Sequence, residues 1–227
     1  MGYEGIFAPK YDPSYPPTHQ IPPGRYDGAP TDGCALFVKS SRFALGDYKI
    51  ARFGDLLPGD SLSRGGLSQV VIIAAILCHD GLTHRFTASV SHLKAGNTDP
   101  ANQRVRRDEC QAWTELMRPW PSPHVLCGDL NEDMAATPPD AGVNTLCRAL
   151  RLQSAYTLGG HEPACTWAGG QSPACLDYIL VPQHTLVRRL WAIPPEYHLS
   201  RPLHRVPTIP SVHYPSDHLA IAAQLVL

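Results

Sequence analysis

The chain alternates between short hydrophobic runs and loops rich in proline, glycine and polar residues. Residues 6–8 form one hydrophobic run, which ends at Pro9, and residues 34–38 form a second that reads as a buried strand. The stretch 12–32 is dense in proline, glycine and tyrosine, which excludes regular structure and predicts a surface loop. Residues 54–68 predict a second polar loop.

Two longer hydrophobic runs, 70–77 and 86–90, predict a β-hairpin. Both are rich in β-branched or aromatic residues, and Gly81 lies in the turn between them. Further strands are expected at 124–127, 176–181 and 220–227.

One long helix is predicted to begin at Asp99, since an acidic N-cap is followed by Pro100 at the first helical position. Hydrophobic residues then recur at helical spacing up to Met117, and Pro119 ends the helix. The opposite face carries Arg104, Arg106, Arg107 and Glu115. We interpret that charged face as solvated and assign no chemistry to it. A short helix is expected at 143–150.

Several strands with few helices outside them predict an α/β (α+β) sandwich, in which two mixed or antiparallel sheets are flanked by helices. With 227 residues, 43% of them hydrophobic, the chain suits a single domain covering 1–227. No run approaches the roughly 18 apolar residues of a membrane helix, and the N-terminus lacks the features of a signal peptide. We expect an intracellular, cytoplasmic protein.

Charge and cysteine content narrow the function. A net charge of −1 argues against a general nucleic-acid coat protein, which would be strongly basic, but it allows a local phosphate site. The seven cysteines lack C-x-x-C spacing and are interpreted as reduced core residues. Cys165 and Cys175, on either side of a glycine-rich loop, fit two free thiols better than a pair.

The most informative motif is Gly128-Asp129-Leu130-Asn131, at the end of the strand predicted for 124–127. Strand alternation would place Asp129 and Asn131 on the same face. A carboxylate beside a neutral donor suits metal-assisted phosphate chemistry. The same four residues are also good turn and cap chemistry, and both interpretations stay open.

Three further polar clusters interrupt strand-like segments. His92 ends the run 86–90, Asp177 begins the run 176–181, and Asp217 and His218 precede the last strand. Each cluster taken alone fits an ordinary strand end or turn.

Together these clusters suggest one site. Asp177 can hold the tautomer of His218 and stabilise its charged form. His92, Asn131 and His218 can donate to a phosphorane-like transition state. Asp129 and Asp217 can offer hard oxygen ligands to a metal ion.

The order and spacing of these motifs resemble the endonuclease/exonuclease/phosphatase superfamily. They are SHL at 91–93, GDLN at 128–131, LDYI at 176–179 and SDH at 216–218. The resemblance extends over nearly the whole chain to the deadenylase branch, and to nocturnin-like proteins in particular. It rests there on GYEGIFAPK at 2–10, DGCALF at 32–37, HLKA at 92–95 and TW at 166–167.

This resemblance implies a four-layer α/β sandwich with its active site at the sheet edges. It implies a magnesium-dependent phosphoesterase, with manganese as a possible substitute, acting on an RNA 3′ poly(A) tail or on the 2′-phosphate of NADP(H). Asp129 would activate the water, Asn131 and His92 would bind the phosphoryl group, and Lys10 and Lys94 would bind substrate phosphate. Asp177 would pair with His218, and Asp129 and Asp217 would bind the metal. We expect a monomer with no membrane association and no stable DNA binding.

The chain departs from the family pattern in two places. The family's main metal ligand is a glutamate on a strand upstream of the Gly-Tyr-x-Gly segment, and this chain begins at Met1. We therefore expect an N-terminally incomplete domain that lacks the first strands and a helix and is weakly active alone. Gly96 stands where nocturnin-like members tend to have an arginine, which weakens the case for NADP(H).

Two rival functions stay open. One is a non-catalytic remnant or binding protein that has lost the metal. The other is a lipid phosphodiesterase of the same superfamily, against which the nucleotide-type segments at 2–5 and 92–94 argue.

Overall fold

The computed structural model describes residues 2–10, 32–57, 69–79, 84–96, 99–168, 173–191, 209–210 and 215–227. Its central feature is a six-stranded sheet with the strand order β3-β4-β5-β6-β8-β7. Only β5 and β6 are parallel, and the other neighbours are antiparallel. The strands are β3 (Phe43–Arg52), β4 (Val70–Cys78), β5 (Arg85–Ser91), β6 (His124–Asp129), β7 (Leu152–Ser154) and β8 (Asp177–Pro182).

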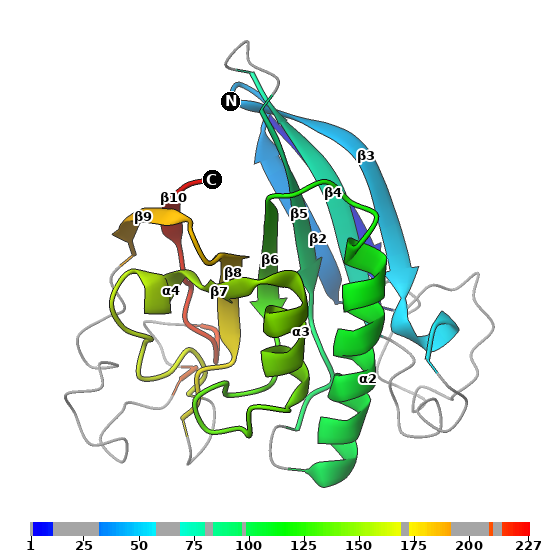
Figure 1. Ribbon diagram of the computed structural model, residues 1–227, viewed down its shortest axis with the longest axis vertical. Coiled ribbons are helices and arrows are strands. Elements are labelled where there is room, and N and C mark those ends of the chain that lie inside the picture. The colour runs from blue at the N-terminus through cyan, green and yellow to red at the C-terminus, as the bar shows by residue number, and fades with distance from the viewer. Residues whose placement is uncertain are drawn as a thin grey trace.

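Two antiparallel two-stranded sheets cover one face of the central sheet, and helices cover the other (Figure 1). The small sheets pair β1 (Tyr3–Pro9) with β2 (Gly33–Lys39), and β9 (Leu186–Leu190) with β10 (Ala223–Val226). The opposite face packs against α2 (Pro100–Met117) and α3 (Gly142–Leu150). Two short helices complete the described elements, η1 (Phe53–Asp55) and α4 (Ala155–Leu158).

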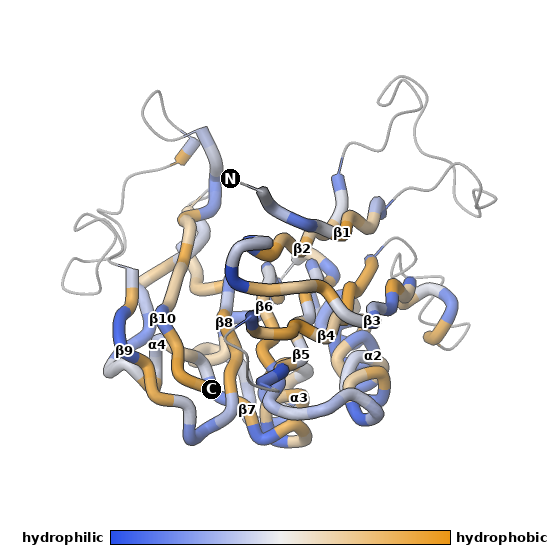
Figure 2. Tube along the Cα trace, turned by 90° about the horizontal axis from the view of Figure 1, so that it is seen from above, coloured by the Kyte–Doolittle hydropathy of each residue, from blue (hydrophilic) through white to orange (hydrophobic). Residues whose placement is uncertain are grey.

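Strand β4 shows why the sandwich forms from this sequence. Val71 and Ile73 pack with Trp113 of α2, whereas Val70 and Ile72 pack against β1 and β2. Because successive side chains point to opposite faces, a strand covered on both faces must be hydrophobic throughout. Figure 2 shows this as continuous hydrophobic colour along β4 in the middle of the molecule.

The predicted α/β sandwich is confirmed, and so are the hairpin of β4 with β5, both predicted helices and the strands at β1, β2, β6, β8 and β10. Helix α2 begins as expected, since the Asp99 carboxylate accepts a hydrogen bond from the Ala101 N–H. The loop predicted for 12–32 and the turn at Gly81 fall outside the described residues, except for Asp32. The described part of the loop 54–68 begins with the last two residues of η1.

Strands β3, β7 and β9 and helix α4 were not predicted. Strand β3 lies at the edge of the sheet and its pairing with β4 shifts register between Leu45 and Tyr48. That irregularity, together with Gly46 and Asp47, breaks the alternation by which strands are recognised. Strand β7 and helix α4 are only three and four residues long, too short for a periodic pattern.

The interpretation of a solvated charged face on α2 is wrong for Arg106. Arg104, Arg107 and Glu115 are exposed, but the Arg106 side chain is fully buried. Residue 106 lies beside Val105 on the side of the helix that faces the turn after β5, where carbonyl oxygens accept its N–H groups. A charged residue predicts an exposed position, but here backbone carbonyl oxygens take the place of water around the guanidinium.

Two further features bear on the earlier expectations. All seven cysteines are free, so Cys165 and Cys175 form no pair. No helix in the described ranges is long and apolar enough to cross a membrane.

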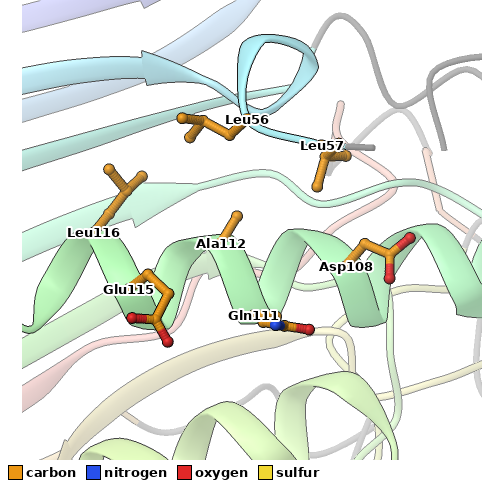
Figure 3. Close-up of a pocket in the computed structure, with 7 residues that line it drawn as sticks. All are labelled: Leu56, Leu57, Asp108, Gln111, Ala112, Glu115 and Leu116. Atoms are coloured by element: carbon orange, nitrogen blue, oxygen red, sulfur yellow. The ribbon is translucent and has the colours of Figure 1, made fainter. Parts of the chain in front are cut away.

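A cavity of about 400 Å³ lies between η1 and α2, and Leu56, Leu57, Ala112 and Leu116 supply much of its lining (Figure 3). None of its lining residues belongs to the predicted site.

Candidate active site

The predicted site residues converge where β1, β5 and β6 end and β8 begins. Asp129 is the last residue of β6, and the antiparallel pairing of β6 with β8 sets it directly opposite Asp177. His92 follows β5, which runs parallel to β6 and therefore ends at the same edge. Lys10 follows β1. The sheet topology thus brings distant segments of the chain to one edge.

Gly128 allows this close approach. A Cβ atom at this position would overlap the carbonyl oxygen of Ser91, and the residue has a φ of +148°. Only glycine adopts this conformation readily and leaves that space free. The glycine therefore lets the end of β6 pass directly beside the segment that carries His92.

Asp129 lies between two imidazole rings. Its Oδ2 is 3.4 Å from Nε2 of His92 and 3.7 Å from Nε2 of His218. Its Oδ1 accepts a hydrogen bond from the Asn131 N–H at 2.9 Å. Burial, reinforced by the nearby charge of Asp177, raises the Asp129 pKa to about 6. Such a carboxyl can both accept and release a proton near neutral pH.

His218 is oriented by Asp177. The Nδ1–H of His218 donates to Asp177 Oδ2 at 2.8 Å, so Nε2 is directed towards Asp129. This hydrogen bond raises the pKa of His218, because it stabilises the charged imidazolium. The pairing of Asp177 with His218 is thus present in the structure.

His92 is oriented by Lys10. The Lys10 Nζ lies 3.0 Å from Nδ1 of His92 and 3.1 Å from Asp32 Oδ2. An ammonium group only donates, so Nδ1 must be the acceptor and the His92 proton must sit on Nε2, facing Asp129. Burial and then the positive charge of Lys10 lower the His92 pKa to about 4, which keeps the ring neutral near pH 7.

We expect Lys10→Met to release this tautomer. Without the ammonium donor, both neutral tautomers of His92 should be populated, and the His92 pKa should rise towards its ordinary value. Ring ¹⁵N chemical shifts measured by NMR report both quantities. Asp32→Asn, which keeps the lysine, is the matched control and should retain the Nε2–H form. Unchanged shifts in Lys10→Met would show that Lys10 does not set the tautomer.

Asn131 reaches the site by a route other than strand alternation. Strand β6 ends at Asp129, and Asn131 has a left-handed φ of 50°. Its backbone N–H is capped by Asp129 Oδ1, as in the turn interpretation, and its Nδ2 donates to the Leu93 carbonyl at 3.1 Å. The argument from alternation was therefore wrong, although Asn131 does lie next to Asp129.

Lys94 and Asp217 lie at the margins of this arrangement. Lys94 is half-buried in the turn after His92, and its backbone is bonded to α2. Asp217 is exposed, and its Oδ2 accepts a hydrogen bond from the Trp167 indole at 3.2 Å.

The described residues do not form a metal site by themselves. Among them, no group of three or more histidine, cysteine, aspartate or glutamate side chains could hold a metal ion. Asp129 is the carboxylate that lies within 4 Å of both histidines, and Asp217 Oδ2 accepts a hydrogen bond from the Trp167 indole. The magnesium ligands expected from the resemblance, Asp129 and Asp217, therefore stay a prediction.

Several supporting residues were not predicted. The Thr166 hydroxyl accepts hydrogen bonds from the N–H groups of Leu176 and Asp177, which fixes the start of β8. Arg52 of β3 donates to the carbonyls of Pro9 and Lys10. Asp32, which forms an ion pair with Lys10, could have been predicted from the sequence. Pairing the runs at 6–8 and 34–38 as antiparallel strands places it opposite Lys10.

Comparison with known proteins agrees with this geometry. The model of the Endonuclease/Exonuclease/phosphatase family matches residues 4–218. Nocturnin of Rattus norvegicus is 31% identical over 97% of this chain, and the CCR4-Not complex 3'-5'-exoribonuclease subunit Ccr4 of Neosartorya fischeri is 24% identical over 87% of it. These matches cover 49% and 35% of the relatives, so the chain spans at most about half of their length.

A solved structure shows the same architecture. The human Nocturnin catalytic domain with bound sulfate anion matches 99% of this chain and 72% of its own, with 28% sequence identity and a TM-score of 0.64. Because the family model spans the segments that carry Lys10, His92, Asp129, Asp177 and His218, the chain belongs to the Endonuclease/Exonuclease/phosphatase family.

Proposed function

We propose that this protein is a phosphoesterase of the nocturnin and deadenylase type, which hydrolyses phosphoester bonds in adenine-containing substrates. The observation that carries the proposal is the continuous series of contacts from Lys10 through His92, Asp129 and His218 to Asp177. It combines a carboxyl that titrates near neutral pH with two oriented imidazoles, which suits attack of water on a phosphoryl group.

In the proposed reaction, Asp129 Oδ2 takes a proton from the attacking water as the new P–O bond forms. The Nε2–H of neutral His92 and of protonated His218 donate to the phosphoryl oxygens, where negative charge develops in the transition state. The ester P–O bond then breaks, and its oxygen takes a proton from solvent. Asn131 binds the phosphoryl group from the turn beside Asp129. Lys10 and Lys94 supply positive charge for the substrate phosphate.

The relatives support an RNA or phosphate substrate, and the adenine is inferred from the resemblance to the deadenylase branch. Ccr4 is named as a 3'-5'-exoribonuclease, and the human Nocturnin domain holds a sulfate, which is a tetrahedral anion like phosphate. Gly96 replaces the arginine expected of nocturnin-like members, which favours an RNA 3′ end over NADP(H) as substrate.

A substrate panel tests the proposal. The protein is incubated with poly(A), poly(U), NADP⁺ and NADPH, and released nucleotide and phosphate are measured. We expect release of AMP from poly(A), and less or no release of phosphate from the dinucleotides. Tight binding of poly(A) without product would instead favour a non-catalytic binding protein.

We also expect the activity to depend on a divalent cation, magnesium or manganese. Members of this family generally depend on divalent metal ions. EDTA should abolish product release, and excess Mg²⁺ or Mn²⁺ should restore it, whereas Ca²⁺ differs in size and preferred geometry and should restore less. Full activity in EDTA would contradict this expectation.

A further inference from the structure

Helix α2 carries two fully buried ionisable side chains, Arg106 and Glu109, and Glu132 from the turn after β6 is buried near them. Burying charged groups costs free energy, and apolar residues of the same size often give equal or greater stability. A buried charged cluster is therefore weak evidence for stability. The hydrogen bonds of these side chains indicate another role.

They hold the turn that carries Lys94. The Lys94 N–H donates to Glu109 Oε2 at 2.9 Å, and the Lys94 carbonyl accepts from Arg106 Nη1 at 2.7 Å. The same Nη1 also donates to the Gly96 carbonyl at 3.2 Å. This turn follows the end of β5, so both backbone polar groups of Lys94 are satisfied by side chains of α2 in place of a neighbouring strand.

Arg106 also faces the second turn of the site. Its Nε lies 3.8 Å from Oε2 of Glu132, the residue directly after Asn131. The other oxygen, Oε1 of Glu132, accepts the Val143 N–H in the first turn of α3 at 2.8 Å. One guanidinium therefore lies between the turn of Lys94 and the turn of Asn131 and contacts both.

Charge in this cluster is balanced by protonation. Burial raises the pKa of Glu109 to about 8, although Lys94 and Arg106 act in the opposite direction and Asp108 adds to the rise. Glu109 therefore accepts a proton more readily than an ordinary glutamate, and Arg106 and Glu132 form the ion pair of the cluster. A glutamine at position 109 would have nearly the same shape and charge as the protonated form of Glu109.

We propose that Arg106 is a positioning residue that fixes the Lys94 turn against the Asn131 turn, and so places Lys94 to bind substrate phosphate. Glu109 accepts the hydrogen bond of the Lys94 amide, and Glu132 forms an ion pair with the guanidinium at 3.8 Å. The inference rests on the proposed function for the role of Lys94, but the contacts that carry it are independent of activity. A planar guanidinium can reach two carbonyls and a carboxylate together, which a lysine ammonium on a flexible chain does not reproduce.

A double-mutant cycle tests the coupling. Arg106→Lys should raise KM about tenfold, which corresponds to a tenfold loss in binding, with a smaller effect on kcat. In a Lys94→Ala background the same substitution should change KM less than about twofold, because residues that act through one another are not additive. Arg104→Lys, two residues earlier and exposed, is the matched control and should leave KM unchanged. Additive effects in the cycle would overturn the proposal.

A second measurement needs no activity and covers the case in which Arg106→Lys fails to fold. Glu109→Leu removes the acceptor of the Lys94 amide, so hydrogen exchange at this amide should become at least about tenfold faster. Glu109→Gln keeps an acceptor and should leave exchange at pH 7 as in the wild type. Equal exchange in the leucine variant would refute the positioning role. Absence of hydrolysis by the wild type would refute the proposed function while leaving this exchange test valid.

Discussion

Replacing Asp129 by alanine is expected to lower kcat at least about 10²-fold while leaving the protein folded, because general acid–base groups contribute 10²–10⁴-fold. Asp129 is the group that lies within reach of both His92 and His218. Its pKa is raised by burial, so the ionised carboxylate is not what stabilises the fold. Steady-state hydrolysis measures the first effect, and thermal melting followed by circular dichroism measures the second.

Asp140→Ala is the matched control for this experiment. Asp140 is exposed and precedes α3, so its removal should change neither kcat nor the melting temperature appreciably. If Asp129→Ala kept more than about a tenth of the wild-type rate, its contribution to the barrier would be below ~1.4 kcal/mol. That is too little for the residue that accepts the proton of the attacking water.

The second large effect is expected for Asp177→Asn. The amide keeps the shape of the carboxylate but loses its charge, so the His218 pKa should fall. The sign follows from the geometry, since the carboxylate raises this pKa by accepting from Nδ1–H. With less imidazolium present near neutral pH, kcat should fall about tenfold or more, and the loss should be largest at higher pH.

Titration of the His218 ring protons by NMR measures the pKa in both proteins. Asp140→Asn serves as the control, because it removes one exposed charge that lies outside the candidate site. Identical His218 titration curves in wild type and Asp177→Asn would remove Asp177 from the site. They would leave His218 as a donor that no carboxylate assists.

The sequence predicted the core of the fold because its strongest patterns are also its strongest packing elements. Strand β4 is hydrophobic throughout since it is covered on both faces, and α2 combines a clear N-cap at Asp99 with apolar residues at helical spacing. Strand β3 was missed because it is an irregular edge strand that makes little use of alternation. Edge position and register shifts depend on the partner strand, which a local pattern does not contain.

The candidate site was predictable where the motif itself carries the chemistry. His92, Asp129 and Asp177 stand at strand ends, and parallel and antiparallel pairing brings them to one edge. His218 lies in an isolated bridge with Trp167, before β10 begins. The contacts of Lys10 with His92 and of Arg106 with the Lys94 turn were not predictable in this way. Each contact joins two segments that come together only in the folded protein. In the sequence alone, a buried arginine also cannot be told from an exposed one.

The central claim, attack of water on phosphorus at this site, is tested most directly by hydrolysis in H₂¹⁸O. The wild type is incubated with poly(A) and with NADP(H) in labelled water, and the products are analysed by mass spectrometry. We expect AMP, or inorganic phosphate, that carries one ¹⁸O on phosphorus, and no label in the ribose hydroxyl released from the ester. Label in the ribose, or the absence of product from both substrates, would contradict the central claim.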